Sequence, residues 1–230
     1  MIDIYFILVE PAVPENIGAA ARAIKTMGFS SLRLVNPANH LADEARWLAH
    51  GSNDILENAQ IFNSLKDAVK DIDWIIGTTA KKRKVNQDYY PADKLNELIR
   101  AKSSTIKSLA IVFGREESGL TNEELSLCHT VTNVPMKTSY PSLNLAQSVM
   151  IYAYTLSMLD YNLLVVDVEK NENEFKALKN KVEAILSEIG FKENTAIYNR
   201  IMERIMVLGE TDIHLIHSIC NKLNENIMND

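Results

Sequence analysis

Residues 109–120 read LAIVFGREESGL. The apolar run 109–113 is typical of a strand buried on both faces, which is the usual environment of strands in parallel sheets. Gly114 follows this run directly, and Thr121 with Glu124 three residues later has the pattern of a capping box at a helix start. We therefore expect a buried strand, a glycine-containing loop and a helix in succession, as in α/β proteins.

The same alternation extends over the first 160 residues. Strands are predicted at 2–9, 32–35, 74–78, 109–113 and 130–134, and helices at 14–27, 41–50, 64–71, 91–102, 121–127 and 143–159. This rhythm predicts an α/β fold, with a mostly parallel sheet flanked by helices on both faces. Residues 167–174 (DVEKNENE) are polar and charged, so a linker is expected over 162–174, after which apolar residues recur at helical spacing. We therefore expect one large domain over 1–161 and a small helical extension over 175–230.

Composition excludes several classes of protein. The chain has 230 residues, of which 47% are hydrophobic and 23% charged, as in ordinary globular proteins. No apolar run approaches the roughly 18–20 residues that cross a bilayer, and the first ten residues do not have the pattern of a signal peptide, so we expect a cytoplasmic protein. Cys128 and Cys220 are far apart and the histidines include no HExxH, so we expect buried, reduced thiols and no metal site.

Charge is unevenly distributed along the chain. The net charge is −6, with 16 basic and 18 acidic side chains in residues 1–160, and 8 basic and 12 acidic side chains in residues 161–230. One dense basic run stands out, consisting of Lys81, Lys82, Arg83 and Lys84. Local charge decides the attraction of phosphate groups, so an acidic total does not exclude nucleic-acid binding. A solvated loop is the alternative interpretation of this run.

The loop after the strand at 109–113 carries the first functional motif. The spacing of Gly114 and Gly119 resembles a phosphate-binding P-loop, but Leu120 occupies the lysine position. Glu116 and Glu117 would also repel a phosphate group. A glycine loop with acidic residues better suits a neutral or positively charged ligand, such as the sulfonium and amine of S-adenosylmethionine. The structural alternative is a simple turn before a capped helix.

Two further motifs lie at predicted helix starts. In the segment 16–22 (NIGAAAR), Asn16 begins a helix and Arg22 follows about a turn and a half later, although a helix cap and a surface arginine would have the same pattern. In the segment 140–146 (YPSLNLA), Ser142 and Asn144 precede a long apolar helix, whose first backbone N–H groups can hold a ligand or simply be capped. The chain has no GxGxxG or GxSxG pattern, which disfavours a dinucleotide-binding enzyme and a hydrolase.

Together, in this order and spacing, the three motifs resemble those of the SPOUT (SpoU–TrmD) methyltransferases, within the SpoU branch and its TrmJ-like and LasT-like proteins. The resemblance rests on residues 15–29 (ENIGAAARAIKTMGF), 113–125 (FGREESGLTNEEL) and 140–154 (YPSLNLAQSVMIYAY). It implies a deep trefoil knot within about residues 75–161, a homodimer, and 2′-O-methylation of RNA ribose with S-adenosyl-L-methionine as cofactor. The implied substrate is tRNA, at nucleotide 32 of the anticodon loop. A ribosomal RNA substrate and a non-catalytic RNA- or cofactor-binding homologue are the alternatives.

The resemblance also implies the residues of the site. Cofactor binding is implied for Thr78, Thr79, Ala80, Gly114, Val134, Met136, Ser142, Leu143 and Asn144, and catalysis for Arg22, Asn16, Glu116 and Asn144. The run of Lys81, Lys82, Arg83 and Lys84 directly follows the strand of this expected cofactor site, a position that favours contact with an RNA backbone, and Arg115 is also expected to bind RNA. A guanidinium has a pKa above about 12 and is a poor base. We therefore expect Arg22 to grip an RNA phosphate or the nascent alkoxide, with Asn16 and Glu116 orienting Arg22 or the substrate.

Overall fold

The computed structural model describes residues 2–80, 89–103, 105–137, 143–159, 168–193, 195–206, 208 and 210–227. The chain divides into two compact units. The first unit holds Ile2–Asn96 and Ser108–Leu159, and it contains the sheet. The second holds Glu97–Lys107 together with the described residues that follow position 160.

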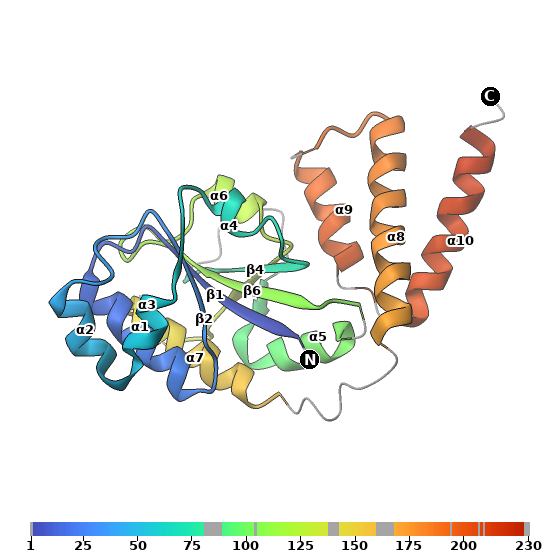
Figure 1. Ribbon diagram of the computed structural model, residues 1–230. Helices are drawn as coiled ribbons and strands as arrows, with labels where there is room; N and C mark the ends of the chain where they lie inside the picture. The colour runs from blue at the N-terminus through green and yellow to red at the C-terminus, as the bar shows by residue number, and fades with distance from the viewer. Residues whose placement is uncertain are drawn as a thin grey trace. The chain divides into compact units, whose positions relative to one another are not determined.

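Among the described residues, seven strands form one sheet, and every pair of neighbouring strands is parallel (Figure 1). The strands are β1 (Asp3–Val9), β2 (Ser31–Val35), β3 (Gln60–Phe62), β4 (Trp74–Thr78), β5 (Tyr89–Pro91), β6 (Ser108–Phe113) and β7 (Thr130–Asn133). Their order across the sheet is β3-β2-β1-β6-β4-β7-β5. The predicted parallel sheet and its five predicted strands are confirmed. The edge strands β3 and β5 were not predicted, because three residues are too short to show a strand pattern.

Helices cover both faces of this sheet, as predicted. In the first unit they are α1 (Pro14–Thr26), α2 (Asp43–Ala49), α3 (Asn53–Glu57), α4 (Leu65–Ala68), α6 (Asn122–Ser126) and α7 (Leu145–Ser157). Figure 1 shows α1 and α7 on one face of the sheet and α4 and α6 on the other. Alternate residues of β6 pack against the helices on opposite faces of the sheet. Val112 packs in the core that includes α4 and α6, whereas Phe113 contacts Tyr152 of α7 edge to face. Burial of β6 on both faces is therefore confirmed.

The helix ends show which local predictions hold. Thr121 and Glu124 form the predicted capping box of α6, and Asn144 caps α7 with Gln147. The helix α1 begins at Pro14, as predicted, so Asn16 lies within its first turn and is not the N-cap that the structural alternative assumed. The N-cap position is Val13, which makes no side-chain cap hydrogen bond, and Pro14 at the first helical position is pre-organised for the helix and has no N–H that needs a partner.

The second unit contains three helices that follow the sheet domain in sequence. They are α8 (Val168–Glu188), α9 (Ala196–Met206) and α10 (Glu210–Ile227), and residues 97–107 include most of α5 (Leu95–Lys102). The predicted linker over 162–174 is corrected at its end, because α8 already begins at Val168. The polar residues there include glutamate and lysine, which are good helix formers.

Several general expectations concern the described residues as a whole. Cys128 and Cys220 are both free and buried, as expected. In the part of the chain that the structure describes, no helix is both long and apolar enough to cross a membrane. Within the same residues, no cluster of three or more histidine, cysteine or acidic side chains could hold a metal ion.

Lys102 is a buried cation in the second unit. Its side chain is fully buried, its Nζ donates a hydrogen bond to the Ile205 carbonyl oxygen at 3.3 Å, and it lies 4.3 Å from the centre of the Phe175 ring. The carbonyl belongs to the last turn of α9, where the helix dipole favours a cation. Burial nevertheless lowers the pKa of Lys102 from 10.5 to about 7.

This pKa predicts a stability that rises with pH. Between about pH 7 and 10.5 the unfolded chain binds the Lys102 proton and the folded chain does not, so the free energy of unfolding increases across this window, by up to ~5 kcal/mol. This rise in stability can be measured by hydrogen-exchange mass spectrometry of α8 and α9 peptides at pH 7, 8 and 9, with correction for intrinsic exchange rates. Lys102→Met is the matched control and should remove the rise, and equal pH dependence in both proteins would contradict the prediction.

Candidate active site

The sheet has a switch point between β1 and β6. These strands are neighbours and parallel, yet β1 leads into α1 on one face of the sheet and β6 leads toward α6 on the other (Figure 1). In open α/β sheets such a point leaves a crevice outside the carboxyl ends of the two strands, where ligands bind. Glu10 follows β1, and Arg115 and Glu116 follow β6 at this position.

Glu116 anchors the start of α1 to the end of β6. Its Oε2 accepts a hydrogen bond from the backbone N–H of Ala12 at 3.1 Å, and its Oε1 accepts from Val13 N at 3.3 Å and from Asn16 Nδ2 at 3.0 Å. Burial raises the pKa of Glu116, but these hydrogen bonds outweigh burial, and the pKa lies below its ordinary value. A carboxylate with three N–H donors and a lowered pKa is a poor general base, so its geometry suits it to holding other groups in place.

Two asparagine side chains continue from Glu116 in a directional relay. An ionised carboxylate only accepts hydrogen bonds, so Asn16 must turn its Nδ2 toward Glu116 and its Oδ1 away. Asn16 Oδ1 accepts from Asn144 Nδ2 at 2.7 Å, and Asn144 Oδ1 accepts from the Ala146 backbone N–H at 2.8 Å. The relay therefore joins all three sequence motifs and fixes the orientation of both amides.

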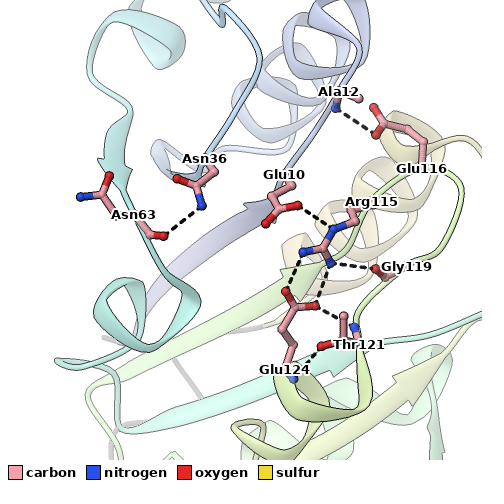
Figure 2. Close-up of polar contacts among 9 residues, drawn as sticks. All are labelled: Glu10, Ala12, Asn36, Asn63, Arg115, Glu116, Gly119, Thr121 and Glu124. Carbon is pink, nitrogen blue, oxygen red and sulfur yellow. Dashed lines mark hydrogen bonds and ion pairs between the residues drawn. The ribbon is translucent and has the colours of Figure 1, made fainter.

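Arg115 forms a second network on the other side of the same loop (Figure 2). Its Nε donates to Glu10 Oε2 at 2.8 Å, while Nη1 and Nη2 each donate to the Glu124 carboxylate at 3.0 Å. Hydrogen bonds to Glu124 and to Glu10 raise the pKa of Arg115, and its side chain is only 23% exposed. The guanidinium is thus engaged within the chain, where the sequence led us to expect an RNA contact.

The loop itself is closed tightly. Gly119 N donates to the Arg115 carbonyl oxygen at 2.9 Å, so the backbone of residues 114–119 turns back on itself. We call this segment the 114–119 loop. A Cβ at Gly114 would lie 2.1 Å from the Gly119 carbonyl carbon and 2.2 Å from Leu120 N. Gly119 has φ +68°, a left-handed conformation that glycine adopts readily. The close backbone contacts therefore require glycine at position 114, and the left-handed backbone favours glycine at position 119.

Two non-glycine residues at the same edge also have left-handed backbones. Glu10 has φ +47° after β1, and Asn36 has φ +42° after β2. Glu10 N donates to the Val35 carbonyl oxygen at 2.8 Å, and Asn36 Nδ2 donates to the Asn63 carbonyl oxygen at 2.9 Å (Figure 2). Such conformations cost of the order of 1–3 kcal/mol and concentrate at functional sites. Two of the three non-glycine residues with positive φ in the described part of the chain lie at the edge that carries the relay, and the third is His50 after α2.

The residues implied for cofactor binding follow the ends of adjacent strands. Thr78 ends β4, Gly114 follows β6 and Val134 follows β7, and these three strands are neighbours in the order β6-β4-β7. The Thr78 hydroxyl donates to the Val112 carbonyl oxygen at 2.9 Å, and Thr79 N donates to the Thr132 carbonyl oxygen at 3.0 Å. The half-buried residues of this set are Thr78, Thr79, Gly114, Val134, Met136 and Leu143, whereas Ala80 and Asn144 are exposed.

Arg22 does not join the relay. It lies six residues after Asn16 on α1, which is about 9 Å along the helix axis. Its side chain is exposed and makes no hydrogen bond or ion pair with the residues that the structure describes. The basic run of Lys81, Lys82, Arg83 and Lys84, as well as Ser142, lies outside the described residues.

Sequence reasoning missed two members of the site. Glu10 was not singled out, and Glu124 was identified only as part of a capping box, although both bind Arg115. The signal for Glu10 was weak, because an acidic residue after a strand is common in loops. Its pairing with Arg115 spans 105 positions and depends on β1 and β6 being neighbours.

Comparison with known proteins gives the family of the chain. The model of the SpoU rRNA Methylase family matches residues 3–154, and that of the C-terminal domain of the tRNA/rRNA methyltransferase LasT matches residues 172–227. An Escherichia coli K12 protein described as an uncharacterized tRNA/rRNA methyltransferase LasT is 41% identical over 224 residues, covering 97% of this chain and 98% of that protein. The tRNA (cytidine/uridine-2′-O-)-methyltransferase TrmJ of Photorhabdus laumondii is 40% identical over 156 residues, covering 68% and 64%.

Solved structures agree with this assignment. A probable methylase family protein from Haemophilus influenzae Rd KW20 has a TM-score of 0.69 at 32% identity, covering 98% of this chain and 97% of that chain. The SpoU methyltransferase AviRb of Streptomyces viridochromogenes, crystallised with the cofactor AdoMet, shares the fold at a TM-score of 0.53 and 19% identity, covering 68% and 60%. Since the family model spans well over half of the chain, this protein belongs to the SpoU methylase family, among its LasT-like and TrmJ-like tRNA/rRNA methyltransferases.

Proposed function

We propose that this protein is an S-adenosyl-L-methionine-dependent 2′-O-methyltransferase that acts on the ribose of tRNA, at nucleotide 32 of the anticodon loop by analogy, and that it works in the cytoplasm. The relay from Glu116 through Asn16 to Asn144 carries the proposal. It joins the motifs of the family at the carboxyl edge of the sheet and leaves them in one fixed geometry. The relative named as a tRNA (cytidine/uridine-2′-O-)-methyltransferase supports the choice of reaction.

The residues at the strand ends fit the proposed cofactor. The closed 114–119 loop, the half-buried Val134 and Met136, and the backbone groups around Thr79 provide apolar and neutral polar surface, which suits an adenosine group. When bound, S-adenosylmethionine supplies a methyl group on a positively charged sulfur. Thr78, Thr79, Ala80, Gly114, Val134, Met136, Ser142, Leu143 and Asn144 are the residues that we propose hold it.

The catalytic roles follow from the chemistry of each side chain. A ribose 2′-oxygen develops negative charge as it loses its proton and attacks. The exposed Arg22 guanidinium would stabilise that charge or grip an RNA phosphate. Asn16 and Asn144, held by Glu116, would orient the substrate through their remaining amide N–H groups.

We also propose a homodimer and a trefoil knot within about residues 75–161. Tyr154 of α7 and Met158, which follows this helix, are 53% and 57% exposed, and exposed large apolar side chains at an apolar helix suit an interface. Sedimentation velocity of the full chain tests the dimer, and a monomer at micromolar concentration would refute it. Tracing the chain in a crystal structure tests the knot, and an unthreaded path would exclude it.

A transfer assay tests the function. The purified protein is incubated with S-adenosylmethionine and with tRNA or ribosomal RNA from a strain that lacks its gene, and 2′-O-methylnucleosides are mapped by mass spectrometry. New methylation in tRNA is the expected result. Methylation confined to ribosomal RNA would favour the second candidate, which the family name suggests. Cofactor binding without any transfer would instead indicate a non-catalytic homologue.

The basic run gives a separate prediction about RNA binding. Replacing Lys81, Lys82, Arg83 and Lys84 together with glutamine should weaken tRNA binding more than ten-fold and reduce the steepness of its salt dependence, because each lost phosphate contact removes about 0.7–0.9 from the slope. Isothermal titration should show unchanged S-adenosylmethionine affinity. Replacing the exposed Lys66 and Lys70 with glutamine is the control. Equal loss of RNA and cofactor binding would mean that the run is structural.

A further inference from the structure

Arg115 is a charged residue of the site that the proposed chemistry does not use. An RNA contact would require a guanidinium that is available to phosphate. The Arg115 guanidinium instead donates to Glu10 and, with two parallel hydrogen bonds, to Glu124. We propose that Arg115 is a positioning residue, which holds the 114–119 loop in the conformation that receives the methyl donor, and that it does not bind RNA. This inference rests on the proposed function.

Both partners of Arg115 are themselves fixed. The Glu124 carboxylate also accepts from the Thr121 backbone N–H at 2.7 Å, within the capping box of α6. Glu10 has a left-handed backbone, and its N–H is bonded to β2 through the Val35 carbonyl oxygen. Arg115 therefore bridges two rigid points, one at the end of β1 and one at the start of α6, across the switch point of the sheet.

Arg115 and Glu116 hold the loop from two sides. Figure 2 shows these consecutive side chains pointing apart, with Arg115 reaching Glu10 and Glu124, and Glu116 reaching Ala12. Two adjacent anchors on different elements leave the backbone between them little freedom to shift. The same loop contributes Gly114 to the proposed cofactor set, so its conformation should determine cofactor affinity.

The charges explain why arginine is needed. Glu10 and Glu124 both lie within 3.0 Å of one guanidinium, so removal of that cation leaves two carboxylates facing each other. A lysine keeps the charge but cannot make the two parallel hydrogen bonds to Glu124. Loss of the bridge should therefore loosen the 114–119 loop, with lysine giving a partial effect.

Cofactor titration and the salt dependence of RNA binding distinguish the two roles. Arg115→Met should raise the dissociation constant for S-adenosylmethionine at least ten-fold, leave the slope of tRNA affinity against salt unchanged, and speed hydrogen exchange in residues 114–120. Arg115→Lys should have a smaller effect of the same kind. Unchanged cofactor affinity with a slope reduced by about 1 would overturn the proposal and identify Arg115 as a phosphate contact.

Two further variants provide internal checks. Glu124→Gln keeps a side chain that can complete the capping box, so it should reproduce the loss of Arg115→Met, and the double variant should be no worse than the stronger single one. Fully additive losses would contradict the bridge. Arg46→Met removes an Arg–Glu pair elsewhere, the more exposed one with Glu57, and should leave cofactor binding unchanged.

The remaining outcomes also test whether Arg115 positions the 114–119 loop. If Arg115→Met does not fold, Arg115→Lys gives the answer by the same measurements. A wild-type protein that binds no S-adenosylmethionine would refute the proposed function, whereas hydrogen exchange of the 114–119 loop would still report on Arg115. Exchange and cofactor affinity equal to those of the wild type in Arg115→Lys and Arg115→Met would refute the positioning role.

Discussion

Arg22→Ala is expected to reduce the rate of methyl transfer by about 100- to 1000-fold, the usual effect of losing one donor that stabilises charge in a transition state. S-adenosylmethionine affinity should stay within two-fold, because Arg22 lies outside the relay and outside the strand ends. Single-turnover transfer to tRNA and isothermal titration of the cofactor measure the two quantities. The melting temperature should change little, since the side chain is exposed and makes no hydrogen bond or ion pair with the described residues.

A charge-conserving variant separates the possible roles of Arg22. Arg22→Lys keeps the positive charge but loses the planar fork, so its rate should lie between those of the wild type and Arg22→Ala. The pH dependence of transfer should not acquire or lose an ionisation in either variant if Arg22 acts as an electrostatic clamp. Near-normal turnover in Arg22→Ala, with the cofactor still bound, would remove Arg22 from the catalytic machinery.

Gly114→Ala should have the second large effect, through the geometry of the loop. The new Cβ would lie 2.1 Å from the Gly119 carbonyl carbon and 2.5 Å from the Gly119 carbonyl oxygen, both backbone atoms that no rotamer change can move. The 114–119 loop must open, which displaces Glu116 from Ala12 and Asn16. We expect S-adenosylmethionine affinity to fall at least 30-fold and the stability of the domain to fall by about 1–3 kcal/mol.

A glycine without close neighbours provides the matched control. Gly51 has φ −72°, and a Cβ there would meet no atom within 4 Å, so Gly51→Ala should leave cofactor binding and stability nearly unchanged. Isothermal titration and urea unfolding of both variants test the contrast. Cofactor affinity in Gly114→Ala equal to that in Gly51→Ala would show that the closed loop is not part of the binding site.

Local features of the site could be predicted from the sequence. The capping box of Thr121 and Glu124, the cap at Asn144 and the strand before Gly114 depend on residues within a few positions of one another. The resemblance to a known family indicated that Asn16, Glu116 and Asn144 belong to one site. It could not give their hydrogen bonds, because the polar atoms of three distant segments meet only once the sheet has assembled.

The charged residues show the limit of sequence reasoning most directly. The sequence around Arg115 is the same whether its side chain contacts RNA or its own chain. Only the positions of Glu10 and Glu124 in the structure show that it contacts its own chain. Likewise, the sequence shows only that Lys102 is a polar residue at the end of a predicted helix. The packing of Phe175 and α9 around it buries its amine. In both cases, the surroundings of one charged side chain depend on partner residues that lie about 9 to 105 positions away in the sequence.

The sequence by itself determined the α/β class, the parallel sheet, the glycine loop after β6 and the family, because these depend on periodicity and on motifs within short segments. The tertiary structure alone decided that the 114–119 loop is held by Arg115 on one side and by Glu116 on the other. The physical reason is the switch point, where β1 and β6 are neighbours and bring Glu10, Ala12 and Glu116 within hydrogen-bonding distance of groups about 100 residues away.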